Sequence, residues 1–326
     1  MFTPLSTLSP IRGQLWKLAS GFALLVHPRH LARKFVRCFL LIQYTVICWC
    51  ARYYRYCNTP AELVTAVEMA LRGLVAIITG SSSGVGAGIA LAFSKEGAKL
   101  SLTGRNLKNL EEVVKDCKKA GCQDVLTNVG DITQDAFRKT LVESTKKKFG
   151  KIDVLVNNAG ISSLCPLQSA TKDQYDRMMA LNVEAPLFLT QLAIPHLIES
   201  KGNVINISTA GTSTIAPGGG VYVMSKVALE AFTRYLAQEL ATKGVRVNTV
   251  NPGIVPSQMI SRIVDDKGQA AEVEKAMIKA TPMGRACAPE EMGHIVAFLA
   301  SDKAGFVTGE SFRADGGFTM TTPAIA

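Results

Sequence analysis

The stretch TGSSSGVG, Thr79–Gly86, decides the fold of this chain because of the segments on either side of it. An apolar run of strand length, Leu74–Thr79, leads directly into it, and the amphipathic pattern AGIALAFSKEGA follows. Glycines permit a sharp turn and a close approach to the backbone, and free N–H groups at a helix start favour negative charge. Between a strand and a helix, this motif predicts a pyrophosphate-binding turn. The residues expected to contact the pyrophosphate are Gly80, Ser82, Ser83, Gly84, Val85 and Gly86.

The alternation of strand and helix continues along the chain and predicts the fold class. The near-continuous apolar character of the strands predicts that they are buried on both faces. We therefore expect an α/β fold, a doubly wound parallel sheet with helices on both faces in a Rossmann-like arrangement, forming one domain over residues 71–320 with a tail at 321–326. The predicted strands are Leu74–Thr79, Lys99–Thr103, Asp124–Val129, Asp153–Val156, Asn203–Ile207 and Val245–Val250, and helices are predicted to begin near Gly86, Leu107, Gln134, Asp173, Tyr222 and Pro289.

The positive charge of the chain is concentrated at one end. The 326 residues carry 36 Lys and Arg against 26 Asp and Glu, a formal net charge of +10. Eight basic residues and no acidic one lie in residues 1–60, so the body of the chain is nearly neutral. Because this excess is confined to an apolar segment and no nucleic-acid-binding module is recognisable, no nucleic-acid partner is predicted. The eight cysteines have no metal-ligand spacing, which predicts reduced thiols and no metal site.

Residues 1–70 form a basic, apolar extension ahead of the domain. Its longer apolar run, Cys38–Cys50, is closed off by Arg37 and Arg52 and is shorter than the roughly 20 apolar residues that a spanning helix needs. Three interpretations remain: an organelle transit peptide, an anchor at a membrane surface through residues 1–60, or an extension with no folded role. The expected location is a membrane surface or an organelle, and otherwise the cytoplasm.

The end of the second strand indicates which nucleotide is bound. In dinucleotide-binding folds this position meets the adenosine ribose, and an acidic residue there would bind the 2′-hydroxyl. The sequence reads Gly104-Arg105 instead, and a guanidinium suits a 2′-phosphate, so NADP(H) is favoured over NAD(H). A solvated surface arginine is the alternative. Asp131 is expected beside the adenine amino group, or else as a helix N-cap in a capping box with Gln134.

A tyrosine and a lysine lie four residues apart in YVMSK, at the start of a predicted helix. Tyr222 and Lys226 therefore share one face of that helix. A phenol with a pKa of about 10 is a poor acid or base at neutral pH, and a neighbouring positive charge favours its phenolate. By itself the motif is also compatible with a surface pair.

Four motifs taken together resemble one family in their order and spacing. They are TGSSSGVG, NNAG at Asn157–Gly160, YVMSK and NPG at Asn251–Gly253, and they resemble the short-chain dehydrogenase/reductases. The resemblance covers about Leu71–Thr319 and includes Leu181–Val183 and the terminal ADGG. Within the family the chain looks most like the NADP-linked carbonyl reductases, including the 3-oxoacyl-carrier-protein reductase and tropinone reductase types.

The resemblance implies hydride transfer between nicotinamide and a carbonyl or secondary alcohol. Tyr222 would exchange the proton with the substrate, Lys226 would hold the nicotinamide ribose and lower the tyrosine pKa, and Asn182 would anchor a water of the proton relay. It further implies a homodimer or homotetramer. The other cofactor contacts implied are Asn158, Ala159 and Gly160 near the adenosine ribose, and Pro252, Gly253, Val255 and Ser257 near the carboxamide.

The chain departs from the family pattern at the hydroxyl that orients the substrate. The family serine lies thirteen residues before the tyrosine, where this chain has Thr209. The S-x-x-G pattern instead favours Ser208 with one inserted residue. Either hydroxyl could polarise a carbonyl.

The segment Ile254–Met283 is predicted to be the lid of the substrate site, and its Met and Ile residues favour a small apolar carbonyl or alcohol. The competing hypothesis is a catalytically impaired nucleotide sensor or scaffold on the same fold, which would bind NADPH without reducing a carbonyl.

Overall fold

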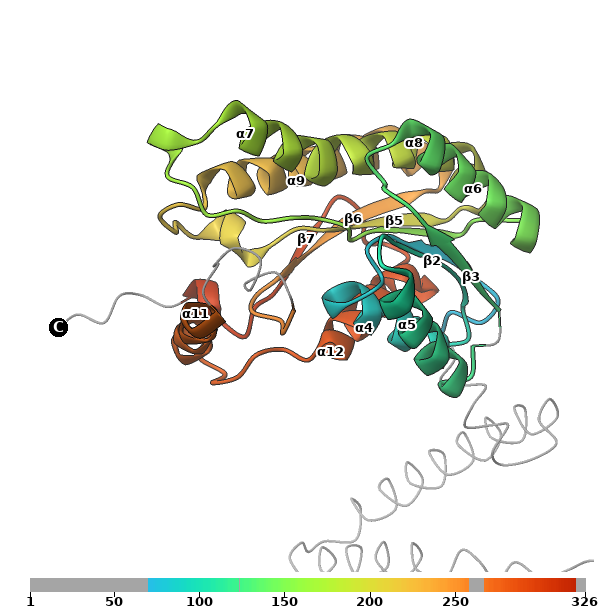
Figure 1. Ribbon diagram of the computed structural model, residues 1–326. Coiled ribbons are helices and arrows are strands. Elements are labelled where there is room, and N and C mark those ends of the chain that lie inside the picture. The colour runs from blue at the N-terminus through green and yellow to red at the C-terminus, as the bar shows by residue number, and fades with distance from the viewer. Residues whose placement is uncertain (1–69, 123, 258–266, 321–326) are drawn as a thin grey trace, which may run out of the picture. The chain divides into compact units, whose positions relative to one another are not determined.

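The computed structural model describes residues 70–122, 124–257 and 267–320 (Figure 1). All but the last residue of the predicted extension, and the whole predicted tail, lie outside the described residues. Within the described ranges, no helix is both long enough and apolar enough to cross a membrane.

Seven parallel strands of the described chain form one sheet in the order β3-β2-β1-β4-β5-β6-β7. The chain runs outward from β1 to β3, returns to β4 beside β1, and then continues to the other edge. The strand order therefore reverses between β1 and β4, which is where parallel α/β sheets bind ligands. The strands are β1 (Val75–Ile78), β2 (Lys99–Gly104), β3 (Val125–Val129), β4 (Val154–Asn157), β5 (Asn203–Ile207), β6 (Arg246–Pro252) and β7 (Ser311–Ala314).

Helices cover both faces of the sheet, as the sequence predicts. One face carries α4, α5 and α12, and the other carries α6, α8 and α9 (Figure 1). Each face has its own buried core, with Phe93 and Val296 in the first and Leu155 and Leu189 in the second. The helices are α4 (Gly84–Lys95), α5 (Leu107–Lys119), α6 (Asp135–Phe149), α7 (Lys172–Met179), α8 (Ala185–Ser200), α9 (Gly220–Leu240), α11 (Lys267–Ala280) and α12 (Pro289–Ala300), and a π-helical turn, η2 (Ala180–Glu184), joins α7 to α8.

The two edges of the sheet differ from the sequence prediction. The central strands β1, β4 and β5 are fully buried, as predicted. The prediction is wrong for β3, whose residues are half-buried or exposed because β3 lies at the edge of the sheet. The sequence analysis also missed β7, whose alternating exposed and half-buried residues SFRA form no apolar run. Its backbone pairs with β6 all the same.

Two glycines allow α4 and α12 to pack backbone against backbone. A Cβ on Gly88 would lie 2.1 Å from the carbonyl oxygen of Pro289, and one on Gly293 would lie 2.5 Å from that of Gly88. Lys95 and Glu290 form an ion pair at the rim of the same contact. Because α4 begins within the TGSSSGVG stretch, this packing also fixes the direction in which the Gly-rich turn leaves the sheet.

Gly88→Ala is expected to lower the free energy of unfolding by about 2–4 kcal/mol, since the added methyl group meets backbone that cannot move aside cheaply. Gly305→Ala is the matched control. Gly305 has a φ of −57°, which alanine adopts easily. The free energy of unfolding of the control should change by less than about 1 kcal/mol. Urea denaturation of both variants measures the difference, and equal stabilities would contradict this account of the packing.

Candidate active site

A cavity of about 570 Å³ opens at the carboxyl ends of the strands, across the β1/β4 reversal point. It contains almost the whole predicted set of site residues, contributed by six different strand ends and the start of α9. Gly86 and Asn182 are the two predicted residues that do not line it. The predicted residues that do are Gly80, Ser82, Ser83, Gly84, Val85, Arg105, Asp131, Asn158, Ala159, Gly160, Ser208, Thr209, Tyr222, Lys226, Pro252, Gly253, Val255 and Ser257.

The Gly-rich turn has the conformation that its glycines predict. Gly80 and Gly84 have φ values of 63° and 55°, in the left-handed region that favours glycine. Gly86 is buried, and a Cβ there would lie 2.4 Å from the carbonyl oxygen of Gly80. Gly86 therefore makes room for the turn and does not line the cavity, and its expected contact with the pyrophosphate stays a prediction. Ser83, the N-cap of α4, makes no side-chain capping hydrogen bond, so the helix start offers its N–H groups to the cavity.

Thr79 and Asn158 tie this turn to the end of β4. The Thr79 hydroxyl accepts hydrogen bonds from the backbone N–H groups of Asn158 and Ala159, at 2.9 and 3.0 Å. In return, Nδ2 of Asn158 donates to the carbonyl oxygens of Thr79 and Gly80, at 2.8 and 3.1 Å. The side chain of Asn158 therefore shapes the turn. Thr79 was missed by the sequence analysis, because its position at a strand end does not reveal partners on another strand.

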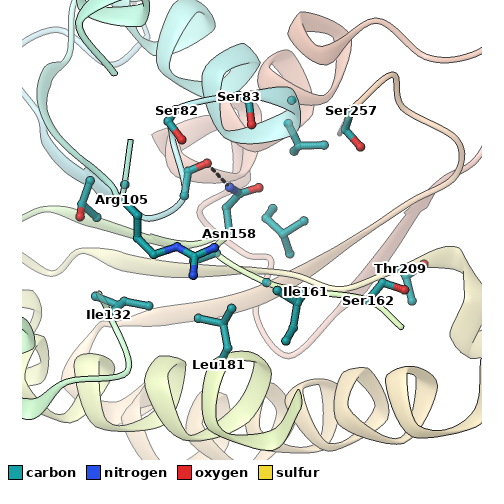
Figure 2. Close-up of a pocket in the computed structure, with 18 of the residues that line it drawn as sticks. Ser82, Ser83, Arg105, Ile132, Asn158, Ile161, Ser162, Leu181, Thr209 and Ser257 are labelled. Carbon is teal, nitrogen blue, oxygen red and sulfur yellow. Dashed lines mark hydrogen bonds between the residues drawn. The ribbon is translucent and has the colours of Figure 1, made fainter. Parts of the chain in front are cut away.

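Arg105 and Asp131 lie at the other end of the cavity. Figure 2 shows the Arg105 side chain reaching over the pocket, although the residue is exposed to solvent. Asp131 accepts hydrogen bonds from the N–H and hydroxyl of Thr133, at 2.9 and 2.8 Å. The Thr133 N–H is the main cause that lowers the pKa of Asp131, and Arg105 adds to it. The capping-box alternative is wrong, because the N-cap of α6 is Gln134.

Tyr222, Thr209 and Lys226 lie together on the wall of the cavity. Burial raises the pKa of Tyr222 to about 12, and a hydrogen bond with the Thr209 side chain opposes that rise. Lys226 is 4% exposed and donates to the carbonyl oxygen of Ile207 at 2.8 Å. Burial lowers its pKa to about 8, and Glu230 acts in the opposite direction. Burial has the largest effect on the pKa of Tyr222, and it raises that pKa. The expectation that Lys226 lowers the tyrosine pKa stays a prediction.

The two candidate hydroxyls differ in their partners. Ser208 is buried, and its Oγ donates to a carboxylate oxygen of Glu230 at 2.7 Å. Thr209 accepts a hydrogen bond from the N–H of Gly211 at 3.2 Å and faces Tyr222. A hydroxyl has one proton to donate, and Ser208 already uses it.

Asn182 is fully buried in the π-helical turn η2. Its Nδ2 donates to the carbonyl oxygen of Ile161 and to Ser225, both at 2.9 Å, and its Oδ1 accepts from the N–H of Ile161 at 3.0 Å. The Asn182 side chain is therefore a buried group that hydrogen-bonds to backbone, the alternative that its position in a helix left open. It fixes the segment after Gly160, and its expected role in holding a water stays a prediction.

The cavity also contains residues that the sequence analysis missed as site residues. Ile132 and Leu181 are apolar neighbours of predicted residues, and position in the chain could have suggested them (Figure 2). Arg177 and Ser162 carry no such signal, because α7 and the loop after β4 reach the cavity only through tertiary packing. The further lining residues are Thr103, Gly104, Asn106, Gly130, Thr133, Ile161, Ala180 and Ile207.

A dinucleotide fits these residues. The turn at Gly80 passes so close to the segment after β4 that a Cβ would lie 2.8 Å from Cα of Ala159. The turn and the start of α4 line the cavity, and the N–H groups of that helix start suit a phosphate. Among the described residues, no group of three His, Cys, Asp or Glu side chains is placed to hold a metal ion. The fold and the site together define a dinucleotide-binding α/β protein.

Comparisons with known proteins identify the family. The family model described as Enoyl-(Acyl carrier protein) reductase matches residues 80–319. An uncharacterized oxidoreductase of Methylorubrum extorquens is 38% identical over 248 residues, 76% of this chain and 98% of that protein. The 3-oxoacyl-[acyl-carrier-protein] reductase of Thermotoga maritima is 32% identical over 255 residues, 77% of this chain and 100% of that protein.

A solved structure agrees with these sequence matches. It is a short-chain dehydrogenase/reductase of unknown function from Caenorhabditis elegans, crystallised with cofactor, with a TM-score of 0.73 and 33% identity. The match covers 78% of this chain and 97% of that one. The chain belongs to the short-chain dehydrogenase/reductase family, as its motifs predict. It is an oxidoreductase of a family that uses a nicotinamide cofactor.

Thr79→Val is expected to weaken cofactor binding and to destabilise the fold by about 2–4 kcal/mol, because two N–H groups lose their acceptor. Thr79→Ser keeps the acceptor and is the matched control. Calorimetric titration with NADPH and thermal melts compare the two variants with the wild type. A valine variant that binds NADPH as tightly as the serine variant would show that the tie does not shape the turn.

Proposed function

We propose that this protein is an NADP(H)-dependent reductase of carbonyl compounds, also able to oxidise the corresponding secondary alcohols, with Tyr222 as the proton donor and acceptor. The observation that carries the proposal is the position of Tyr222, Thr209 and Lys226 on the wall of the same cavity as the Gly-rich turn. A nicotinamide, when bound, supplies or accepts the hydride.

The protonation state of Tyr222 suits proton donation. A phenol with a pKa of about 12 is protonated at neutral pH, so it can give its proton to a carbonyl oxygen as that oxygen gains charge. The hydrogen bond with Thr209 favours the phenolate that remains. We expect the positive charge of Lys226, one helical turn away on α9, to stabilise it as well. In the oxidation direction the same groups act in reverse, and Tyr222 accepts the proton.

Thr209 is proposed as the hydroxyl that orients the substrate. What supports Thr209 over Ser208 is that the Ser208 proton is committed to Glu230, whereas Thr209 faces Tyr222. The methyl group of Thr209 occupies space beside the reacting carbonyl, so it is expected to influence substrate shape more than the reaction.

The preference for NADP(H) rests on Arg105. The strand end carries no carboxylate to bind a 2′-hydroxyl, and the guanidinium lies at the rim of the cavity where a 2′-phosphate would contact it. Asp131, an acidic side chain that lines the same cavity, accepts its hydrogen bonds from Thr133. A 2′-phosphate would therefore meet a charge of the opposite sign.

The substrate class, assembly and location are also proposals. A small apolar carbonyl or alcohol is supported by Ile161, Val255 and Leu181 on the cavity wall. A homodimer or homotetramer is supported by exposed apolar side chains on α8 and α9, Phe188 and Tyr235. A membrane-surface or organelle location rests on the basic, apolar composition of residues 1–60.

Tyr222→Phe is expected to lower the turnover number by about 10²–10⁴-fold while the Kd for NADPH stays unchanged, because only the transferable proton is removed. Tyr175→Phe, an exposed tyrosine on α7 that does not line the cavity, is the control and should retain full activity. NADPH consumption over a panel of apolar ketones and aldehydes measures both. Full activity of Tyr222→Phe would contradict the mechanism, and NADPH binding by the wild type without turnover would favour a nucleotide sensor.

Arg105→Ala is expected to raise the Kd for NADPH by about 10–100-fold and to leave the Kd for NADH nearly unchanged, since one charge-assisted contact to the 2′-phosphate is lost. Lys108→Ala removes a positive charge three residues further on, outside the cavity. This control should change neither Kd by more than about twofold. Equal losses of NADPH and NADH affinity in Arg105→Ala would exclude Arg105 as the selector.

A further inference from the structure

Glu230 does not line the cavity, but it accepts a hydrogen bond from Ser208, which does. It follows Lys226 by one turn of α9 and is half-buried. One of its carboxylate oxygens accepts two hydrogen bonds, from Oγ of Ser208 at 2.7 Å and from Nδ2 of Asn251 at 2.6 Å. Ser208 follows β5 and Asn251 lies near the end of β6, so one carboxylate joins a helix to two strand ends.

These strand ends carry the residues next to the reacting groups. Asn251 also donates to the backbone carbonyl oxygen of Thr209 and to the hydroxyl of Thr212, both at 3.2 Å. Thr209 is thus held from both sides, through Ser208, its neighbour in the chain, and through Asn251 on the adjacent strand. Without the carboxylate, a buried hydroxyl and a buried amide would each lose an acceptor.

The carboxylate also supplies a negative charge close to a buried cation. Lys226 is 4% exposed, and the negative charge of Glu230 opposes the effect of burial on its pKa by favouring the charged form. On β5, the group that Lys226 contacts is neutral, the backbone carbonyl oxygen of Ile207. Another cation from a neighbouring helix that lines the cavity is Arg177 on α7, and its charge is paired with the carboxylate of Asp173 at 2.5 Å.

We propose that Glu230 is a positioning residue of this active site: its carboxylate holds Thr209 in place through Ser208 and Asn251, and it balances the charge of Lys226. Glu230 contacts neither substrate nor cofactor and acts through these residues. The inference rests on the proposed roles of Tyr222, Lys226 and Thr209.

Glu230→Gln tests the charge separately from the hydrogen bonds, because the amide oxygen of glutamine can still accept from Ser208 and Asn251. Removing the negative charge lowers the pKa of Lys226 further, so the lysine loses its own charge at a lower pH. The alkaline limb of kcat/KM for ketone reduction by NADPH should therefore move to lower pH by about one unit. Glu239→Gln, an exposed glutamate on the same helix, should leave the limb where it is in the wild type.

Ser208→Ala tests the positioning separately from the charge. It removes the hydrogen bond between Ser208 and Glu230, which helps to hold Thr209, and it keeps the carboxylate. The value of kcat should therefore fall about tenfold, while the alkaline limb stays at its wild-type pH. The proposal would be overturned if the alkaline limb of kcat/KM for Glu230→Gln lay at the wild-type pH. It would also be overturned if kcat of Ser208→Ala equalled that of the wild type. Since both variants are compared with Tyr222→Phe, a failure of the proposed function is recognised independently, by activity of the phenylalanine variant.

Discussion

The structure depends on the contact between the ends of β1 and β4, where the strand order of the sheet reverses. A turn rich in glycine has little tendency to hold one shape, because each glycine loses more backbone freedom on folding than any other residue. Here the shape is imposed from the neighbouring strand, by the hydrogen bonds between Thr79 and the Asn158-Ala159 segment. The packing of α4 on α12 fixes the other end of the turn.

The chemistry of the site rests on a buried charge. Burial disfavours the ammonium of Lys226, and the protein offsets that cost with the carbonyl of Ile207 and the carboxylate of Glu230. Burial also keeps Tyr222 in its neutral form. A neutral phenol beside a cation is the arrangement that the proposed proton donation requires: burial favours the neutral phenol, and Glu230 favours the cation.

Most of the fold could be predicted, since apolar runs and Gly-rich turns report buried parallel strands directly. The exceptions were the two edge strands and α11, whose segment was predicted only as a lid. β3 and β7 carry polar or exposed residues because each has only one neighbouring strand. In β7 only Phe312 and Ala314 pack against the core, too few to form an apolar run. The site residues that local motifs carry, such as Tyr222 and Arg105, were found. Thr79 was missed because its hydrogen-bond partners, Asn158 and Ala159, are distant in the chain. Arg177 was missed because α7 reaches the cavity only through tertiary packing.

The fold class and the family could be predicted from the chain alone, because they depend on local patterns that are displayed in order along its length. Tertiary structure alone decided the roles of similar side chains. Ser208 and Thr209 are adjacent hydroxyls, and only the position of Glu230 separates them. Gly86 and Asn182 belong to motifs that face the cofactor, yet packing turns both into supports for the backbone. A motif specifies which residues are present, and the direction of each side chain depends on contacts that only the folded chain brings together.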